Sequence, residues 1–244
     1  MTGTWMQRTA QVWLVYTITK SPLMVGILGV CQFMPMLLFS LFAGAVVDRF
    51  PKKRILLITQ VMFLLQAVAM TVLTFTGVIQ YWHVFILIAF FGITQTFDMP
   101  ARQSYFIELV GRDDVMNAIS LNSTAINLTK IVGPAISGII MVTYGPGFCF
   151  LFNAISYVAV IIGLALIDTP PICNRTSGGK MLSEISEGLK YIRSNDILVL
   201  NVIIMAVVCT FTLNGDVVMP VFAKEALGQG AAGYSILMSA TGIV

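Results

Sequence analysis

Charge is the first thing that this sequence has little of. Only 10% of its 244 residues are charged, whereas soluble domains carry about a quarter. With 57% hydrophobic residues and a mean hydropathy of +0.90, a water-soluble globule would leave much apolar surface exposed. The composition therefore predicts an all-α integral membrane protein, with the lipid bilayer around it.

Residues that catalyse reactions or bind metals are also scarce. The single histidine, His83, is predicted at the edge of a membrane segment, and neither a pair of carboxylates nor a phosphate-binding glycine loop occurs. The four cysteines have no metal-binding spacing and are interpreted as packing residues. We therefore expect no enzyme activity, no metal site and no cofactor. We expect no nucleic-acid partner, because the cations lie between apolar segments rather than on one basic face.

Apolar segments recur along the whole chain. Most are long enough to cross a ~30 Å hydrocarbon core as helices, although the fourth and the eighth are short. The predicted segments are residues 2–19, 23–47, 55–76, 82–97, 115–143, 148–167, 197–219 and 228–244. Two longer polar connections separate them, at 98–114 and at 168–196, and the second contains a predicted amphipathic helix near 181–193.

Lysine and arginine are concentrated in every second connection. Ten of the 14 cations lie in the even-numbered connections, namely Arg49, Lys52, Lys53, Arg54, Arg102, Arg112, Arg175, Lys180, Lys190 and Arg193. Because positive residues remain on the cytoplasmic side, these loops are predicted to be cytoplasmic in a multi-pass protein of the cell (inner) membrane.

The connection after the second segment carries the pattern G-x-x-x-D-R-x-x-K-K. Its members are Gly44, Asp48, Arg49, Lys52 and Lys53. The pattern resembles the signature loop between helices 2 and 3 of the major facilitator superfamily, although Pro51 stands where that family usually has glycine.

The order of segments resembles the same family, whose chains fold as two six-helix bundles joined by a cytoplasmic linker. The resemblance implies a first bundle at 1–167, the linker at 168–196 and the start of a second bundle at 197–244. It also implies that the first helix is clipped and that the second bundle is incomplete.

The stretches GTWMQRTAQVWLVY, DMPARQSYFIELV, DDVMNAISLN and KIVGPAISG resemble the enterobactin-exporter and macrolide-efflux branch of this family. That resemblance implies a secondary active transporter that exports a small organic molecule by alternating access. The alternative is a truncated chain that transports nothing and acts as a membrane interaction module. Protons are one candidate coupling ion, but the arginine motif that many drug/proton antiporters carry in helix 4 is not present here.

Two cations fall inside predicted membrane segments. Arg8 precedes Lys20 by 12 residues, about 18 Å along a helix, and Lys130 is near the middle of the fifth segment. Because a charge at this depth is costly, each is a functional candidate, with structural pairing to an acid as the alternative. Together with Gln11 and Asn127 they predict a cavity for an anionic or polar substrate such as a siderophore. A lipophilic drug is the competing substrate class.

Three further features are candidates for conformational roles. Asp48, at the end of the second segment, is predicted to bind the opposite bundle in one conformation and to lose that contact in the other. Asp98, predicted to end the fourth segment, is expected to pair with Arg102 or Arg112 at the cytoplasmic edge, and proton coupling is its alternative role. In the fifth segment, Gly133, Pro134 and Gly138 resemble the helix-5 motif of exporters. Proline kinks a helix and glycine allows close approach, so a gate is one interpretation and a kink without function is the other.

Overall fold

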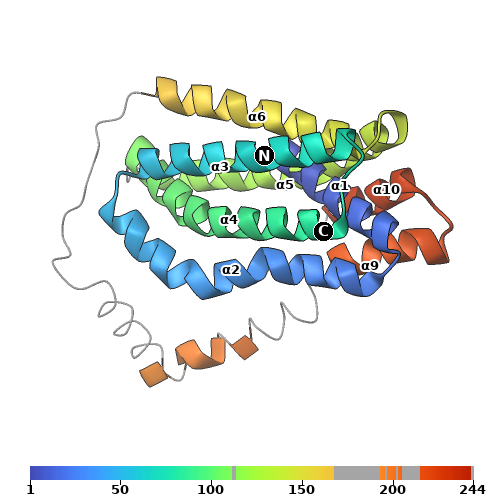
Figure 1. Cartoon of the computed structure of the whole chain (residues 1–244). Coiled ribbons are helices and arrows are strands. Elements are labelled where there is room, and N and C mark those ends of the chain that lie inside the picture. The colour runs from blue at the N-terminus through green and yellow to red at the C-terminus, as the bar shows by residue number, and fades with distance from the viewer. Residues whose placement is uncertain (112–113, 168–192, 196, 202, 205–214, 243–244) are drawn as a thin grey trace.

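The protein is a bundle of long helices that run roughly along one direction (Figure 1). The computed structural model describes residues 1–111, 114–167, 193–195, 197–201, 203–204 and 215–242. The regular elements in these residues are all helical, which confirms the all-α prediction. They are α1 (Thr2–Thr19), α2 (Pro22–Arg49), α3 (Lys52–Phe75), α4 (Tyr81–Val110), α5 (Val115–Thr143), α6 (Pro146–Leu166), α9 (Gly215–Val221), the π-helix η1 (Phe222–Ala226) and α10 (Ala231–Thr241).

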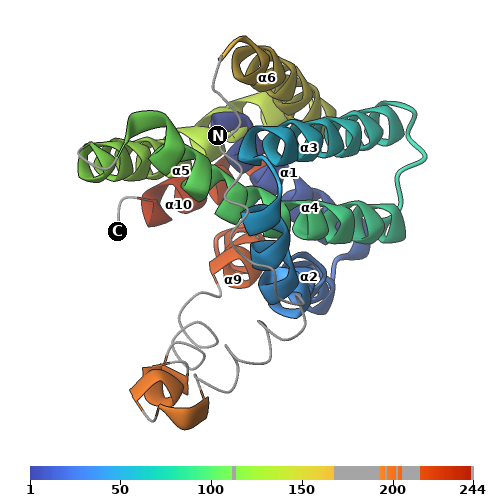
Figure 2. The same cartoon turned by 90° about the vertical axis from the view of Figure 1, so that its left-hand side faces the viewer.

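Helix α1 lies in the interior of the bundle, as the end-on view in Figure 2 shows. It packs against α5 and α6, whereas α2 packs on α4, and α3 packs on both α4 and α6. Helix α10, although distant in sequence, packs on α5. Most of the helix–helix packing of α1 is thus with α5 and α6.

Five of the described helices, α2 to α6, are long and apolar enough to cross a membrane. Helix α1 is not among them, because glutamines and Arg8 interrupt its apolar residues. Burial differs between the five helices. Half of the most apolar part of α3 is buried, against 17% for α2 and 28% for α5. The faces of α2 and α5 are therefore the most open in the described part of the molecule.

A buried chain of amide side chains joins α1, α3 and α6. Gln7 donates from Nε2 to Gln66 Oε1 at 2.7 Å, and Asn153 donates from Nδ2 to Gln7 Oε1 at 2.8 Å. All three side chains are at most 2% exposed. These polar side chains of α1, α3 and α6 thus hydrogen-bond to one another inside the bundle.

Helix α4 extends well beyond its predicted end. The sequence pattern ended this helix at residue 97 and placed a polar connection at 98–114, but the helix runs to Val110 and Pro100 lies inside it. The prediction was wrong because polarity alone does not mark a loop. The charged residues of this part find partners within the bundle, and proline is tolerated where neighbouring helices support the backbone.

The seventh segment also ends later than predicted. Its predicted end was residue 219, whereas helical structure continues through α9 and η1 to Ala226. The hydropathy pattern ended the segment before Lys224 and Glu225 because they are charged. The structure instead places both residues in η1. The predicted amphipathic helix near 181–193 and the middle of the seventh segment lie outside the described residues, apart from Arg193.

Candidate functional site

Arg8 of α1 and Lys130 of α5 meet on one aromatic ring. The Arg8 guanidinium carbon is 5.2 Å from the ring centroid of Trp5, and the Lys130 ammonium nitrogen is 5.9 Å from it. Arg8 also lies 5.7 Å from the ring centroid of Phe33 on α2. These four residues, Trp5, Arg8, Phe33 and Lys130, are called the Trp5 cluster. It places two positive charges about 6 Å or less from one electron-rich ring, which is the geometry of cation–π attraction.

The close approach of α1 to α5 creates the Trp5 cluster. A Cβ atom added to Gly133 would lie 2.6 Å from the Cβ of Trp5 and 3.2 Å from the carbonyl oxygen of Thr2, so only glycine fits there. One turn further on, the Ser137 hydroxyl donates to the carbonyl of Met6 at 3.2 Å. Small residues on α5 thus bring the two helices into contact, as is usual for helices packed in membranes.

Lys130 occupies a weak point of α5. Pro134 has no N–H group, so the carbonyl of Lys130, four residues earlier, loses its helical partner. The charged side chain and the missing backbone hydrogen bond therefore lie in the same turn of α5.

The other two predicted cavity residues are placed differently. Gln11 on α1 is 3% exposed, and its Nε2 has no hydrogen-bond partner among the described residues. Asn127, one turn before Lys130 on α5, is exposed. Asn127 can therefore be reached from the open face of α5, whereas Gln11 is a donor enclosed in the bundle.

The predicted switch loop contains fewer residues than expected. Helix α2 ends at Arg49 and α3 begins at Lys52, so only Phe50 and Pro51 lie between them. The sequence pattern placed the lysines in the loop and began the helix at residue 55, which is wrong. Proline at the N-cap fixes the backbone for an immediate helix start.

Both lysines of the motif are engaged within the bundle. Lys52 is 6% exposed and its Nζ lies 3.5 Å from Glu108 Oε1 on α4. Lys53 donates to the carbonyls of Ala165, at 3.3 Å, and Ile167 at the end of α6. Cations are unfavourable at the start of a helix, and these acceptors offset that cost.

The acid of the motif is free of such contacts. Asp48 is exposed in the last turn of α2 and pairs with no cation among the described residues. A Cβ atom added to Gly44, one turn earlier, would meet no other described atom within 4 Å, so this face of α2 is uncovered.

Asp98 is the most fully hydrogen-bonded carboxylate of the described residues. It is 7% exposed and lies in the middle of α4 rather than at its end. Thr59 and Gln60 of α3 donate to its Oδ1 at 2.7 and 2.8 Å, and Arg102 donates to both oxygens at 2.9 to 3.2 Å. These four residues are called the Asp98 cluster. They connect α3 to α4 through charge-assisted hydrogen bonds.

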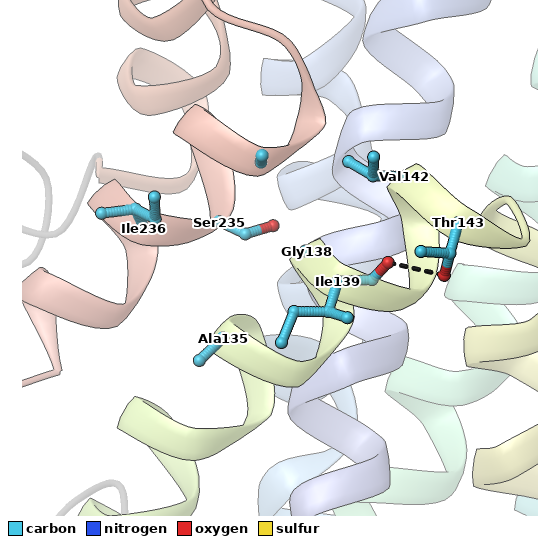
Figure 3. Close-up of a pocket in the computed structure, with 8 residues that line it drawn as sticks. Ala135, Gly138, Ile139, Val142, Thr143, Ser235 and Ile236 are labelled. Atoms are coloured by element: carbon cyan, nitrogen blue, oxygen red, sulfur yellow. Dashed lines mark hydrogen bonds between the residues drawn. The ribbon is translucent and has the colours of Figure 1, made fainter.

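A groove of about 320 Å³ lies between α5 and α10 (Figure 3). Gly138 lies at the point of closest approach, where an added Cβ atom would meet the Cβ of Ser235 at 2.5 Å. The walls are almost entirely apolar, with Ile139 and Ile236 facing outward at 68% exposure. The groove shares no residue with the Trp5 cluster, and on α5 Gly133 lies against α1 whereas Gly138 lies against α10.

Comparison with known proteins supplies the family. Residues 1–244 match the family model described as "Transmembrane secretion effector" (MFS_3). The chain belongs to the major facilitator superfamily. The prediction of this superfamily and of its efflux-type branch is thus confirmed. The relatives are transporters rather than enzymes.

Three relatives of this major facilitator chain illustrate the branch. A "Staphyloferrin A transporter" of Staphylococcus aureus is 33% identical over 166 residues, covering 67% of this chain and 42% of the relative. The "Multidrug efflux pump Tap" of Mycolicibacterium fortuitum is 29% identical over 194 residues, covering 74% and 46%. The "Macrolide efflux protein A" of Streptococcus pyogenes is 21% identical over 179 residues, covering 72% and 44%. The chain spans about half the length of the curated relatives that it matches.

Sequence reasoning missed two members of the Trp5 cluster of this major facilitator chain. Trp5 is three residues before Arg8 on the same helix, so its contact with Arg8 was within reach of a helical-spacing argument. Phe33 is on another helix, and no local pattern relates it to Arg8.

Proposed function

We propose that this chain takes part in the export of a small organic anion across the cell membrane by alternating access, with the Trp5 cluster in the substrate site. The observation that carries the proposal is that Arg8 and Lys130, the second near the middle of α5, lie beside one ring. Lys130 pairs with no carboxylate among the described residues, and its half-buried side chain lies beside the Trp5 ring. A cation without an acidic partner attracts an anion.

The relatives are all named as transport or efflux proteins, which supports the proposed transport, but their names give different substrates. One is named as a siderophore transporter, and the others are named as efflux proteins for drugs or macrolides. Two cations at the site favour the anionic class. An uncharged or cationic macrolide would gain nothing from Lys130.

The test compares two substrates in cells that lack their own exporters. For Lys130→Ala we expect the efflux of an anionic catechol siderophore to fall about tenfold to a hundredfold, because a hydrogen bond to a charged group contributes about 1.5–3 kcal/mol. Efflux of a neutral macrolide is expected to change less than threefold. Rates of efflux from preloaded cells provide the measurement.

Lys20→Ala is the matched control, because it removes a lysine that lies at the end of α1 outside the cluster. Equal loss of both substrates in Lys130→Ala would show that the cation holds the bundle together, and the anion proposal would be abandoned. If the membrane-inserted wild-type chain moves neither substrate, the alternative of a transport-inactive interaction module gains support.

We further propose that Asp48 is the switch residue of the loop. Its partners Lys52 and Lys53 in the motif are already engaged within the bundle, so the exposed carboxylate is the group left to contact a second bundle. Such an acid favours the conformation in which a cation or a helix N-terminus approaches it.

Asp48→Asn is therefore expected to reduce the transport rate at least severalfold at an unchanged protein level. The amide keeps the size of the side chain and removes its charge. Efflux rate normalised to the amount of membrane-inserted protein is the measurement. An unchanged normalised rate would refute the switch role.

The remaining candidates are assigned in the same way. We propose that Gly133, Pro134 and Gly138 form a gate, because the two glycines bring α5 directly against α1 and α10 and Pro134 interrupts its backbone hydrogen bonds between them. We propose that Asp98 and Arg102 stabilise the contact of α3 with α4. A proton-carrying role for Asp98 fits poorly, since both of its oxygens already accept hydrogen bonds.

We also propose that the end of the bundle that carries Asp48 faces the cytoplasm, because the cations are concentrated in the connections at that end.

A further inference from the structure

Helix α1 has a second hydrogen-bonded side, which lies outside the Trp5 cluster. Gln7 makes two short bonds there, donating to Gln66 Oε1 of α3 at 2.7 Å and accepting from Asn153 Nδ2 of α6 at 2.8 Å. One turn earlier, the Thr4 hydroxyl lies 3.3 Å from the Tyr157 hydroxyl of α6. These contacts attach the first half of α1 to α3 and α6.

The contact of α1 with α6 is as close as its contact with α5. A Cβ atom added to Gly3 would lie 2.5 Å from Asn153 Oδ1, compared with 2.6 Å between a Cβ added to Gly133 and the Cβ of Trp5. The same Asn153 oxygen accepts from the Ser156 hydroxyl at 3.0 Å, so the Asn153 amide is held at both of its atoms. Helix α1 is therefore enclosed between α6 on one side and α5 on another.

Gln7 uses both atoms of its amide in this contact. Its nitrogen donates to Gln66 and its oxygen accepts from Asn153, and the side chain is 2% exposed. Hydrogen bonds are directional, whereas apolar contacts are not. The two bonds of Gln7 thus fix how α1 is rotated about its own axis, which apolar packing alone does not.

The rotation of α1 determines whether both cations of the Trp5 cluster reach one ring. Gln7 and Arg8 are consecutive, so their side chains leave the helix about 100° apart and turn together. A rotation of about 20° would move a side chain at the surface of α1 by roughly 2 Å. Arg8 and Trp5 share α1, so the distance between them would hardly change. The 5.9 Å between Lys130 and the Trp5 ring would change, because it joins two helices and is already near the limit of about 6 Å for cation–π attraction.

The other end of α1 is held by different residues. The Tyr16 hydroxyl donates to Glu225 Oε1 on η1 at 2.9 Å. The Trp13 ring stacks on the Tyr234 ring of α10, with centroids 5.5 Å apart. Because these contacts do not involve Gln7, we expect a change at Gln7 to reorient the first half of the helix without releasing α1 from the bundle.

We propose that Gln7 is a positioning residue of the substrate site. Through Gln66 and Asn153 it sets the rotation of α1 at which Lys130 lies beside the Trp5 ring. Gln7 itself is enclosed and does not touch the substrate. The inference rests on the proposed function, in which the Trp5 cluster binds an organic anion.

The first test examines the surroundings of Trp5 without transport. Trp13→Phe and Trp82→Phe keep an aromatic ring at both positions and leave Trp5 as the only one of the three tryptophans. Its fluorescence in the purified chain is quenched with iodide, an anion, and with neutral acrylamide. Nearby cations concentrate iodide at the ring, so the ratio of the iodide to the acrylamide quenching constant measures the positive charge beside Trp5.

Gln7→Met keeps the length of the side chain and removes its hydrogen bonds. We expect this variant to lower the quenching ratio about twofold, because Lys130 no longer lies beside the ring. An unchanged ratio would overturn the proposal.

Gln60→Met is the matched control, because it is the same substitution at an equally buried amide. Gln60 is 2% exposed and donates to Asp98 Oδ1 at 2.8 Å, but this bond joins α3 to α4 rather than to α1. The control is expected to lower the temperature of unfolding and to leave the quenching ratio unchanged. An equal fall of the ratio in Gln7→Met and Gln60→Met would mean that loss of any buried hydrogen bond loosens the cluster, and the positioning role would be rejected.

The second test breaks the same bond from the other helix. Gln66→Met removes the acceptor of Gln7 and leaves α1 itself unchanged. In proteoliposomes we expect it to raise the KM for the catechol siderophore about fivefold, the factor that corresponds to one hydrogen bond, with kcat changed less than about twofold. A fall of kcat at an unchanged KM would contradict the proposal, because a misplaced binding site weakens binding first.

The two failures are distinguishable. If the wild type moves no siderophore, the proposed function fails, and the quenching ratio of Gln7→Met still decides whether Gln7 positions the cluster. If the wild type transports the siderophore and Gln7→Met leaves the ratio unchanged, only the positioning role fails.

Discussion

Gly133→Ala is expected to destabilise the protein and to abolish most of its transport. The added methyl group would lie 2.6 Å from the Cβ of Trp5 and 3.2 Å from a backbone oxygen of α1, so α1 and α5 must separate. Overpacking of this kind costs about 1–3 kcal/mol. Because Trp5 carries both cations of the cluster, the same displacement changes the substrate site. Thermal unfolding of the purified protein in detergent and efflux rates measure the two effects.

Gly163→Ala is the matched control for this substitution. Gly163 is also a helical glycine, on α6, but an added Cβ atom there meets no other described atom within 4 Å. Alanine should therefore be neutral or stabilise α6 by about 0.5–1 kcal/mol, because glycine is a poor helix former. If the two variants unfold at the same temperature, the close contact of α1 with α5 is not what requires glycine at position 133.

Asp98→Ala is expected to produce the largest loss of stability. It would leave Arg102, Thr59 and Gln60 without their common acceptor. Removing one partner of a buried ion pair costs about 3–5 kcal/mol. The Arg102 side chain is 30% exposed, so solvent screens part of its charge and we expect about 2–3 kcal/mol. The unfolding transition in detergent provides the measurement, and Asp48→Ala, at an exposed acid, should change it by less than about 0.5 kcal/mol.

A double-mutant cycle separates pairing from simple loss of a side chain. If Asp98 and Arg102 stabilise the protein as a pair, Asp98→Ala/Arg102→Ala will be clearly more stable than the sum of the single effects indicates. Strict additivity would contradict the pairing. A proton-carrying Asp98 makes a different prediction, namely that Asp98→Asn removes the dependence of transport on the proton gradient and leaves stability unchanged.

Predictions from local pattern succeeded where a residue's surroundings are set by the bilayer. The apolar segments became helices α2 to α6, and the residues at 115–143 coincide with α5. The same reasoning failed at 98–110, because hydropathy assigns a charged residue to a loop whether or not the fold provides a partner. Asp98 and Glu108 remain in α4 since Arg102 and Lys52 neutralise them there.

In the candidate site, too, local pattern identified individual residues but not their contacts with other helices. Arg8 and Lys130 were identified from the cost of a charge inside the membrane, which depends only on position along a helix. That they share the ring of Trp5 depends on how α1 and α5 are rotated and how closely they approach. Neither the spacing in α1 nor the polar residues of α5 contains that information.

The sequence by itself determined that this protein lies in a lipid bilayer, that it is all-α and that it belongs to the major facilitator superfamily. Those properties follow from composition, from the length of apolar segments and from a short motif, all of which are local. The tertiary structure alone decided which cations meet on Trp5, which residues of α3 donate to Asp98, and which residues join α1 to η1 and α10. Contacts between residues on different helices depend on the packing of whole helices, because small residues such as Gly133 set how closely two backbones approach.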